Sequence, residues 1–235
     1  MKTEMIKIDR DDMDLREMKR AGEILKKGGL VAFPTETVYG LGGDALDETA
    51  AHRIYEAKGR PSDNPLIIHI ADMEHLDKIV EEVPEAAHKL AEAFWPGPLT
   101  MIMNKSDAVP RGTTGGLDTV AIRMPSDPIA LELIRQGGGY VAAPSANTSG
   151  RPSPTTAQHV YEDLQGKIPM ILDGGAVTIG LESTIVDLTE EIPTILRPGY
   201  ISLEMVQAVL GEAKMDKGLI SSDSNIHPKA PGMKY

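Results

Sequence analysis

The chain has 235 residues, a formal net charge of −11 and no cysteine. That length accommodates one large domain, or one domain with an appendage. The lack of cysteine excludes disulfides, zinc–thiolate sites, iron–sulfur clusters and cysteine nucleophiles. The acidic balance argues against broad electrostatic binding of duplex nucleic acid, so a polyanion site must be a local cluster of Lys and Arg.

The N-terminal sequence MKTEMIKIDRDDMD is charged and lacks the apolar region of a signal peptide. The longest apolar runs have the length of strands, far below the ~20 residues of a membrane span. These features predict a cytoplasmic protein with no membrane partner. An aromatic content of 4% also argues against a stacking platform for single-stranded nucleic acid.

Segments with helical spacing alternate with short apolar runs along the chain. Helices are expected at 14–27, 50–58, 73–82, 84–94, 128–136, 157–165 and 203–210. Strands are expected at 30–33, 66–70, 99–103, 119–124, 140–144, 170–173, 183–188 and 194–196. Most of these strands are apolar at consecutive positions, which favours strands covered on both faces. The alternation predicts an α/β layer architecture.

Individual residues predict where some of these helices begin and end. Thr49 is expected to cap the helix at 50–58, and Asp72 the helix at 73–82. Leu15 is expected on the apolar stripe of the first helix. From Gly211 onward the sequence is polar and contains Gly, Ser and Pro. It predicts a domain over 1–211 and a linker or extended arm over 212–235.

The first candidate motif is FPTETVYGLGGDA at 33–45, which leaves a strand and precedes a helix. Its glycines partly match a dinucleotide-binding fingerprint, and they equally suit a glycine-rich strand-to-helix turn. No GxxxxGK[ST] occurs, so a P-loop is excluded. Thr35, Glu36 and Thr37 follow the buried strand, at the place where open α/β sheets bind ligands.

The second motif is KGRPSDNPL at 58–66. Lys58 offers a point charge, and Arg60 a planar fork that matches phosphate or carboxylate. Pro61 restricts Arg60 to an extended conformation, and the proline after Asn64 does the same there. A helix C-terminus explains Lys58 and Gly59 equally well. Both interpretations stay open for those two residues, but the helix end does not explain Arg60 or Asn64.

Two further residues lie inside apolar strands. His69 in LIIHI is more typical of a satisfied core residue than of a ligand-binding one. The functional interpretation is a neutral imidazole that donates to a bound substrate. Arg123 in TVAIRMP is costly to bury unpaired, so it pairs with an internal carboxylate or awaits a ligand carboxylate.

The third motif is APSANTSGRPSPTT at 143–156, which follows a buried strand and runs into a helix N-terminus. Hydroxyl, amide and backbone N–H groups at such a place suit a phosphate. Ser183 in LESTIVDL and Arg197 in LRPG lie at further strand boundaries. We expect these groups, with the cations named above, to line one crevice for a small polyanion such as a nucleoside triphosphate.

The motifs PTETVYGLG, KGRPSDNPL, FWPGPLT, AIRMP, PSANTSGRPSPT, DGG, ESTIVD and LRPG, in this order, closely resemble the YrdC-like threonylcarbamoyl-AMP synthases over roughly residues 10–211. The resemblance implies an open, twisted, mixed or parallel α/β sheet with helices on its faces and a concave ligand-binding side. It also implies that L-threonine, bicarbonate and ATP give threonylcarbamoyl-AMP and pyrophosphate. That product serves N6-threonylcarbamoyladenosine formation in tRNA, so tRNA and a downstream threonylcarbamoyl transferase are implied as indirect partners.

The resemblance also implies roles for residues of this chain. L-Threonine is expected against Thr35, Thr37, His69, Arg123 and Ser183. ATP is expected along Lys58, Arg60, Asn64, Thr119, Ser145, Asn147, Ser153, Arg197 and Tyr235, with Lys58 and Arg60 as the catalytic pair. Mg²⁺ is expected to arrive with the triphosphate. No residue stands out as a general base, and Glu36 and Glu182 are equally compatible with structural roles.

Alternatives stay open at this stage. One is a non-enzymatic RNA-binding or ribosome-maturation module of the same fold, and another is a carbamoyl-adenylate-forming domain like those in hydrogenase maturation. A third is a structural domain with an empty crevice. The tail APGMKY resembles the start of the linker in longer two-domain members, so the chain is expected to be either a shortened form of such a member or a member that lacks the C-terminal domain. The sequence does not determine the oligomeric state.

Overall fold

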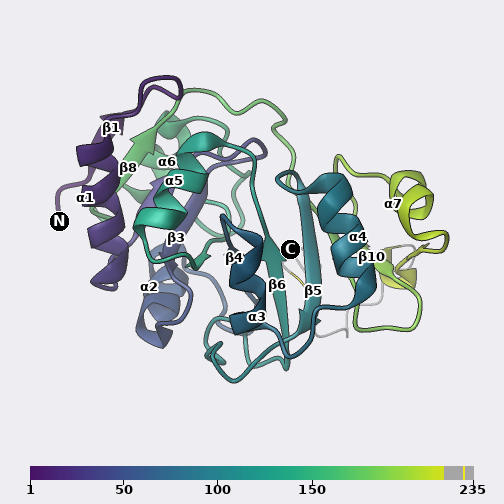
Figure 1. Cartoon of the computed structure of the whole chain (residues 1–235). Coiled ribbons are helices and arrows are strands. Elements are labelled where there is room, and N and C mark those ends of the chain that lie inside the picture. The colour runs from purple at the N-terminus through teal and green to yellow at the C-terminus, as the bar shows by residue number, and fades with distance from the viewer. Residues whose placement is uncertain (220–229, 231–235) are drawn as a thin grey trace.

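A computed structural model of the chain describes residues 1–219 and residue 230 (Figure 1). Within these residues eleven strands form one sheet, in the order β1-β8-β2-β3-β7-β4-β6-β5-β9-β10-β11. The strands are β1 (Glu4–Lys7), β2 (Val31–Phe33), β3 (Gly40–Asp44), β4 (Ile67–His69), β5 (Leu99–Asn104), β6 (Thr119–Arg123), β7 (Val141–Ala142), β8 (Met170–Asp173), β9 (Thr184–Asp187), β10 (Thr194–Arg197) and β11 (Lys214–Met215). Parallel pairs such as β4–β6 alternate with antiparallel pairs such as β5–β6, which confirms the expected open, mixed sheet.

Helices cover this sheet along its length, and Figure 1 shows α1 at one end of the molecule and α7 at the other. The helices are α1 (Leu15–Lys26), α2 (Glu48–Lys58), α3 (Leu76–Ile79), α4 (Glu85–Phe94), α5 (Pro128–Gln136), α6 (Ala157–Leu164) and α7 (Leu203–Leu210). Two short 3₁₀ helices are η1 (Met73–His75) and η2 (Lys217–Leu219). None of the helices in the described residues has the length and hydropathy of a membrane-spanning helix.

The glycine-rich part of the first motif is a strand, not the turn that the sequence suggested. β3 pairs antiparallel with β2, and Gly42 stands opposite Val31. A Cβ atom on Gly42 would lie 2.8 Å from a Val141 methyl carbon and 2.9 Å from the Phe33 ring. Glycine is therefore required there because neighbouring side chains approach the backbone closely. Low strand propensity hid this central strand from the sequence pattern.

One predicted helix cap was wrong, and one predicted helix starts where expected but is not continuous. Asp47 rather than Thr49 caps α2, because its carboxylate accepts a hydrogen bond from the Thr49 backbone N–H. The helix expected at 73–82 is divided into η1 and the single-turn α3. Asp72 precedes η1 but its side chain makes no capping hydrogen bond.

Helices α1 and α5 pack together on one face of the sheet through Met18, Leu25 and Leu133. Asp14 caps α1 as its carboxylate accepts from the Arg16 backbone N–H. Leu15, expected on the apolar stripe, is 61% exposed. The first turn of α1 therefore projects beyond the core, and burial begins one turn later at Met18.

Alternate residues of the central strands point to opposite faces of the sheet. On one face Ile68 and Ile122 enter the large core beneath α2, α3 and α4. On the other face Ile67, Ala121 and Ile185 belong to a small separate apolar cluster. That second face also bears the polar residues of the candidate site.

Packing continues beyond Gly211, where the sequence predicts the domain to end. β11 pairs parallel with β10 at the edge of the sheet. Ala213 is buried beside it. Residues 220–229 and 231–235 lie outside the described residues.

Candidate active site

One cavity of about 410 Å³ collects nearly all the residues that the sequence singled out. Its lining includes Thr35, Thr37, Lys58, Arg60, Asn64, His69, Arg123, Ser145, Asn147, Ser153, Ser183 and Arg197. These residues come from strand ends, from the last residue of α2 and from the loops beside them. The cavity therefore confirms that the separate motifs lie together, as an open α/β sheet requires of a ligand site.

Strand alternation explains why these polar side chains share one face. His69 lies two residues after Ile67 on β4, and Arg123 two residues after Ala121 on β6. Ser183 lies two residues before Ile185 of β9. Residues two apart on a strand point the same way, so each polar group borders the small apolar cluster rather than the main core.

Arg123 is held by an internal network on three sides. Its Nη2 donates to Glu36 Oε1 over 2.6 Å, Nη1 donates to Thr37 Oγ1 over 2.9 Å, and Nε donates to the Gly97 carbonyl over 3.3 Å. A guanidinium has five N–H groups. These contacts with described residues use three of them, which leaves one on each terminal nitrogen to meet a ligand.

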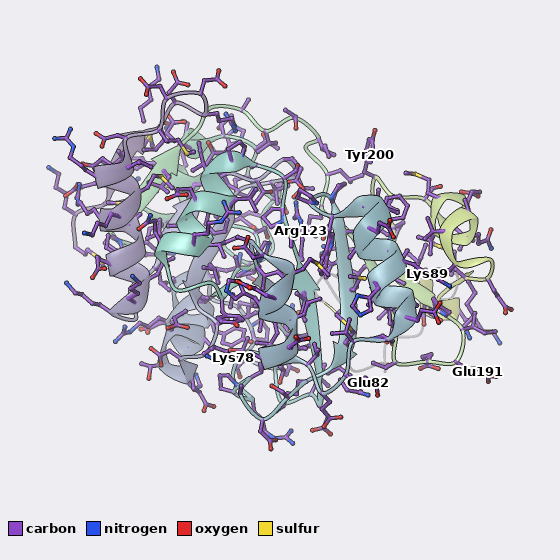
Figure 2. The ribbon with its side chains drawn as sticks, in the orientation of Figure 1. Lys78, Glu82, Lys89, Arg123, Glu191 and Tyr200 are labelled. Carbon is purple, nitrogen blue, oxygen red and sulfur yellow. The ribbon has the colours of Figure 1, made fainter. Side chains whose placement is uncertain are left out.

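Glu36 is the buried carboxylate that offsets the free-energy cost of burying the Arg123 charge. The Arg123 and Glu36 side chains are 5% and 9% exposed, and Figure 2 shows Arg123 inside the molecule whereas Lys89 and Glu191 lie on its outside. The second Glu36 oxygen accepts from the Ser126 backbone N–H. Both Glu36 oxygens are thus occupied by structural contacts. Arg123 has the internal carboxylate partner that a buried arginine needs, and it still has N–H groups for a ligand carboxylate, so both interpretations of Arg123 fit the structure.

Lys58 is the last residue of α2, and Gly59 after it adopts φ = 61°. Its Nζ donates to the carbonyls of Ser145 and Asn147, the latter over 2.5 Å, and it lies 3.4 Å from Asn147 Oδ1. Lys58 therefore both ends a helix and ties the loop after β7 to it. Burial, and secondarily the Arg60 charge, lowers the pKa of Lys58 to about 7.

The loop after α2 orients its own cation. Arg60 Nη2 donates to the Pro65 carbonyl over 3.0 Å and Nε donates to the Asn64 carbonyl over 3.3 Å. Burial lowers the pKa of Arg60. Within the described residues Asn64 Oδ1 is buried and has no hydrogen-bond partner. A buried acceptor without a partner in a cavity wall suits a donor on a ligand.

Glu182 links two of the expected residues in the cavity lining. Its Oε2 accepts from Arg197 Nη1 over 2.5 Å, and its Oε1 accepts from Ser153 Oγ over 2.8 Å. Arg197 Nε also donates to the Ser183 carbonyl over 3.0 Å. Glu182 therefore positions a cation and a hydroxyl along the cavity, which is a structural role.

His69 is neutral in this setting. Burial, and then the nearby Arg123 charge, lowers the pKa of His69 to about 3. Its Nδ1 lies 3.1 Å from the Ile67 carbonyl, and a carbonyl oxygen only accepts hydrogen bonds. The proton of the neutral ring is therefore on Nδ1, and Nε2 carries a lone pair. The sequence interpretation assigned donation to this ring, whereas the geometry makes Nε2 an acceptor.

Thr119 is not in the cavity lining, and one expected residue lies outside the described residues. Thr119 pairs with Asn104 at the start of β6, and Arg123 is at the end of the same strand. Four residues of strand separate them by roughly 13 Å, and Thr119 does not contribute to the cavity lining. Tyr235 lies outside the described residues.

The sequence interpretation also missed one residue that contacts the site. Thr100 on β5 is fully buried, and its hydroxyl lies 2.7 Å from Ser183 Oγ. The motif FWPGPLT contains it. A lone threonine in an apolar strand is so common that only its contact with Ser183 reveals it.

The comparisons with known proteins agree with this geometry. The sequence model of the Sua5/YciO/YrdC family, described as "Telomere recombination", matches residues 23–199. The chain belongs to the Sua5/YciO/YrdC family. Its similarity to YrdC-like proteins, inferred from the motifs, is thereby confirmed.

Curated relatives within the Sua5/YciO/YrdC family carry one name. A protein of Pyrococcus abyssi, named threonylcarbamoyl-AMP synthase, is 55% identical over 226 residues, which cover 96% of this chain and 66% of the relative. A protein of Bacillus subtilis with the same name is 54% identical over 220 residues, which cover 93% of this chain and 63% of the relative. The chain therefore spans about two thirds of the length of these relatives.

A solved structure of the family matches the fold closely. The crystal structure of P. abyssi Sua5 complexed with L-threonine has a TM-score of 0.95 at 54% identity. The match covers 99% of this chain and 68% of that chain. The mixed open sheet and its covering helices are therefore those of the Sua5/YciO/YrdC family.

Proposed function

We propose that this chain is the domain that makes threonylcarbamoyl-AMP and pyrophosphate from L-threonine, bicarbonate and ATP. The observation that carries this proposal is the single cavity in which Lys58, Arg60, Arg123 and Arg197 meet the expected hydroxyl and amide groups. Bicarbonate and ATP are both negatively charged, and a chain whose net charge is −11 needs such a local concentration of cations to bind them. The names of the curated relatives support the same reaction.

In this proposal L-threonine lies at the end of β6. The two remaining N–H groups of Arg123 bind its carboxylate, and the hydroxyls of Thr37 and Ser183 border it. The Nε2 lone pair of His69 faces the substrate as an acceptor for an amine N–H. Thr35 supports Thr37, since their hydroxyl oxygens are 2.9 Å apart. The L-threonine complex of P. abyssi Sua5 supports an amino-acid site in this fold.

ATP occupies the remainder of the cavity. Arg60 and Arg197 neutralise phosphate oxygens from two walls, and the buried Asn64 oxygen accepts from the nucleotide. Ser145, Asn147 and Ser153 border the same space. Thr119, which is not in the cavity lining, and Tyr235, which lies outside the described residues, remain proposed nucleotide contacts.

The chemistry needs positioning and charge neutralisation more than proton transfer. The threonine amine and bicarbonate first form a carbamate with loss of water. A carbamate oxygen then attacks the α-phosphorus of ATP, and the bond to pyrophosphate breaks. Both reactants are anionic, so Arg60 and its neighbouring cations lower the barrier by offsetting the repulsion as the charges approach.

Mg²⁺ enters this proposal only as the ion that accompanies the triphosphate. Within residues 1–219 and 230, no three histidine, aspartate or glutamate side chains gather where they would hold a metal ion. We further propose that the product serves tRNA modification in the cytoplasm through a downstream transferase. Residues 212–219 include β11, which pairs with β10, so the proposed linker toward a C-terminal domain begins after them.

Lys58 gives the proposal a pH signature. Its pKa is about 7 in the free cavity, and a nearby triphosphate raises that pKa because opposite charges favour the protonated form. At pH 8 we expect ATP binding to take up roughly half a proton or more, and at pH 6 to take up little, since Lys58 is then already protonated. Calorimetric titration of ATP in two buffers of different ionisation enthalpy measures this uptake.

The control for the proton count is Lys58→Met. This variant removes the titrating group, so ATP binding should be equally free of proton uptake at pH 8 and pH 6. Uptake at pH 8 that persists in Lys58→Met would assign the proton to another group and contradict this role of Lys58.

The direct test of the proposed function combines binding and turnover. L-Threonine and ATP are titrated into the chain separately, and pyrophosphate release is then measured with both substrates and bicarbonate. We expect saturable binding of each ligand, and pyrophosphate release that requires both L-threonine and bicarbonate. Release that is indifferent to L-threonine, or the absence of binding by either ligand, would refute the proposal.

A further inference from the structure

Thr100 is a buried hydroxyl whose contact points to a role in the site. It lies on β5 and is fully buried, and its Oγ1 is 2.7 Å from Ser183 Oγ. Among residues 1–219 and 230, Ser183 is the one hydrogen-bond partner recorded for that hydroxyl. Ser183 lines the cavity and Thr100 does not. Thr100 therefore acts on a ligand only through Ser183.

Ser183 is also bonded from a second side. Arg197 Nη2 donates to Ser183 Oγ over 3.1 Å. A guanidinium carries no acceptor, so the direction of this hydrogen bond is fixed. A serine hydroxyl has one proton and two lone pairs, and Arg197 occupies one of the lone pairs.

The direction of the Thr100–Ser183 hydrogen bond follows from burial. If Ser183 donated to Thr100, the Thr100 proton would lack an acceptor at a position that water does not reach. Leaving a buried donor unpaired costs more free energy than the hydrogen bond contributes. Thr100 is therefore the donor, and it occupies the second lone pair of Ser183 Oγ.

We propose that Thr100 is a positioning residue that, together with Arg197, leaves Ser183 only its proton to offer, so that Ser183 donates a hydrogen bond to an anionic oxygen of the substrate. The substrate oxygen that fits is one of the L-threonine carboxylate, since Ser183 faces the same cavity as Arg123. This inference rests on the proposed function because L-threonine is its ligand.

Thr37, which lines the same cavity, is held in a similar way. Arg123 Nη1 donates to Thr37 Oγ1 as Arg197 Nη2 donates to Ser183 Oγ. Thr35 Oγ1 already receives hydrogen bonds from the backbone N–H groups of Thr37 and Val38. The Thr37 proton is consequently also best placed toward the cavity. Both hydroxyls thus suit an anion, which is the charge that Arg123 binds.

The experiment compares Thr100→Val, which removes the donor with little change of shape, with Thr100→Ser, which keeps the donor. Calorimetry measures the Kd of each variant for L-threonine and for ATP separately. We expect Thr100→Val to raise the Kd for L-threonine roughly 3- to 10-fold, as for one lost hydrogen bond, and to change the ATP value less than about 2-fold. Thr100→Ser should stay within about 2-fold of wild type for both ligands.

Two controls separate positioning from a general loss of stability. Thr194→Val removes a buried hydroxyl whose partner is the Ile192 carbonyl, away from the cavity, so it should lower the Tm without changing the Kd for L-threonine. In a Ser183→Ala background, Thr100→Val should have no further effect on that Kd, because the residue it positions is gone. If Thr100→Val does not fold, Thr100→Ala removes the same donor without adding a methyl group.

The outcomes distinguish this inference from the proposed function. L-Threonine binding by wild type with an unchanged Kd in Thr100→Val would overturn the role of Thr100 alone. An equal weakening by Thr100→Ser and Thr100→Val would overturn it as well, since the hydroxyl would then not matter. Failure of wild type to bind L-threonine at all would overturn both proposals.

Discussion

Arg123→Ala is expected to weaken L-threonine binding about 100-fold or more, which corresponds to about 3 kcal/mol for charge-assisted hydrogen bonds to a carboxylate. The ATP affinity should fall much less, because Arg123 faces the end of the cavity that borders Thr37 and Ser183. Calorimetric titration with each ligand separately measures the two effects. Equal losses for both ligands would contradict the assignment of Arg123 to L-threonine.

The same substitution also affects folding, and this second effect needs its own control. It leaves Glu36 buried without its cation, which costs about 3–5 kcal/mol of stability for a buried pair. In the double variant Glu36→Gln, Arg123→Ala the unpaired charge is removed. We expect the double variant to recover much of the lost Tm but none of the L-threonine affinity. Recovery of binding together with Tm would show that Arg123 acts only by stabilising the fold.

Arg60→Ala is the second large effect. Arg60 lies on a loop that holds its guanidinium through two backbone carbonyls, at the wall where we place the phosphates. Removing an electrostatic contact to a transferring phosphoryl group typically costs about 3–4 kcal/mol at the transition state, or roughly 10²–10³ in kcat/KM for ATP. A pyrophosphate-release assay with varied ATP measures this loss, and the Kd for L-threonine should change only a few-fold.

A matched control for Arg60 is Arg111→Ala. The Arg111 side chain is 62% exposed and pairs with the exposed Asp118, so its removal changes the net charge equally without touching the cavity. Wild-type turnover is expected in that variant, because exposed ion pairs contribute about 0–1 kcal/mol. If Arg60→Ala also retained wild-type turnover, Arg60 would be removed from the proposed reaction.

The contacts around Arg123 show the difference between what the sequence predicts and what the tertiary structure adds. The strand-end position of Thr37 and the cost of burying Arg123 were both visible in the sequence. Their direct contact, and the third partner Glu36, were not, because residues 86 and 87 positions apart meet only when β2 and β6 take their places in the sheet. Contacts of such separation carry no local sequence signal.

The same limit explains what the sequence interpretation placed wrongly or missed. Gly42 looked like part of a turn because strand propensity disfavours glycine, yet close packing by Val141 and Phe33 demands it. The sequence around Thr100 contains no feature that distinguishes it from other threonines in strands, and only its contact with Ser183 connects it to the site.

Sequence by itself determined the α/β class, most of the helices and strands, and the chemical groups of the site. Local periodicity, capping residues and the cost of burying charge are properties of short segments, so they can be read before the chain folds. Tertiary structure decided which groups are occupied and which face the cavity. The order of strands brings distant residues into hydrogen-bonding range, and their burial then fixes where each proton lies, as for His69 and Ser183.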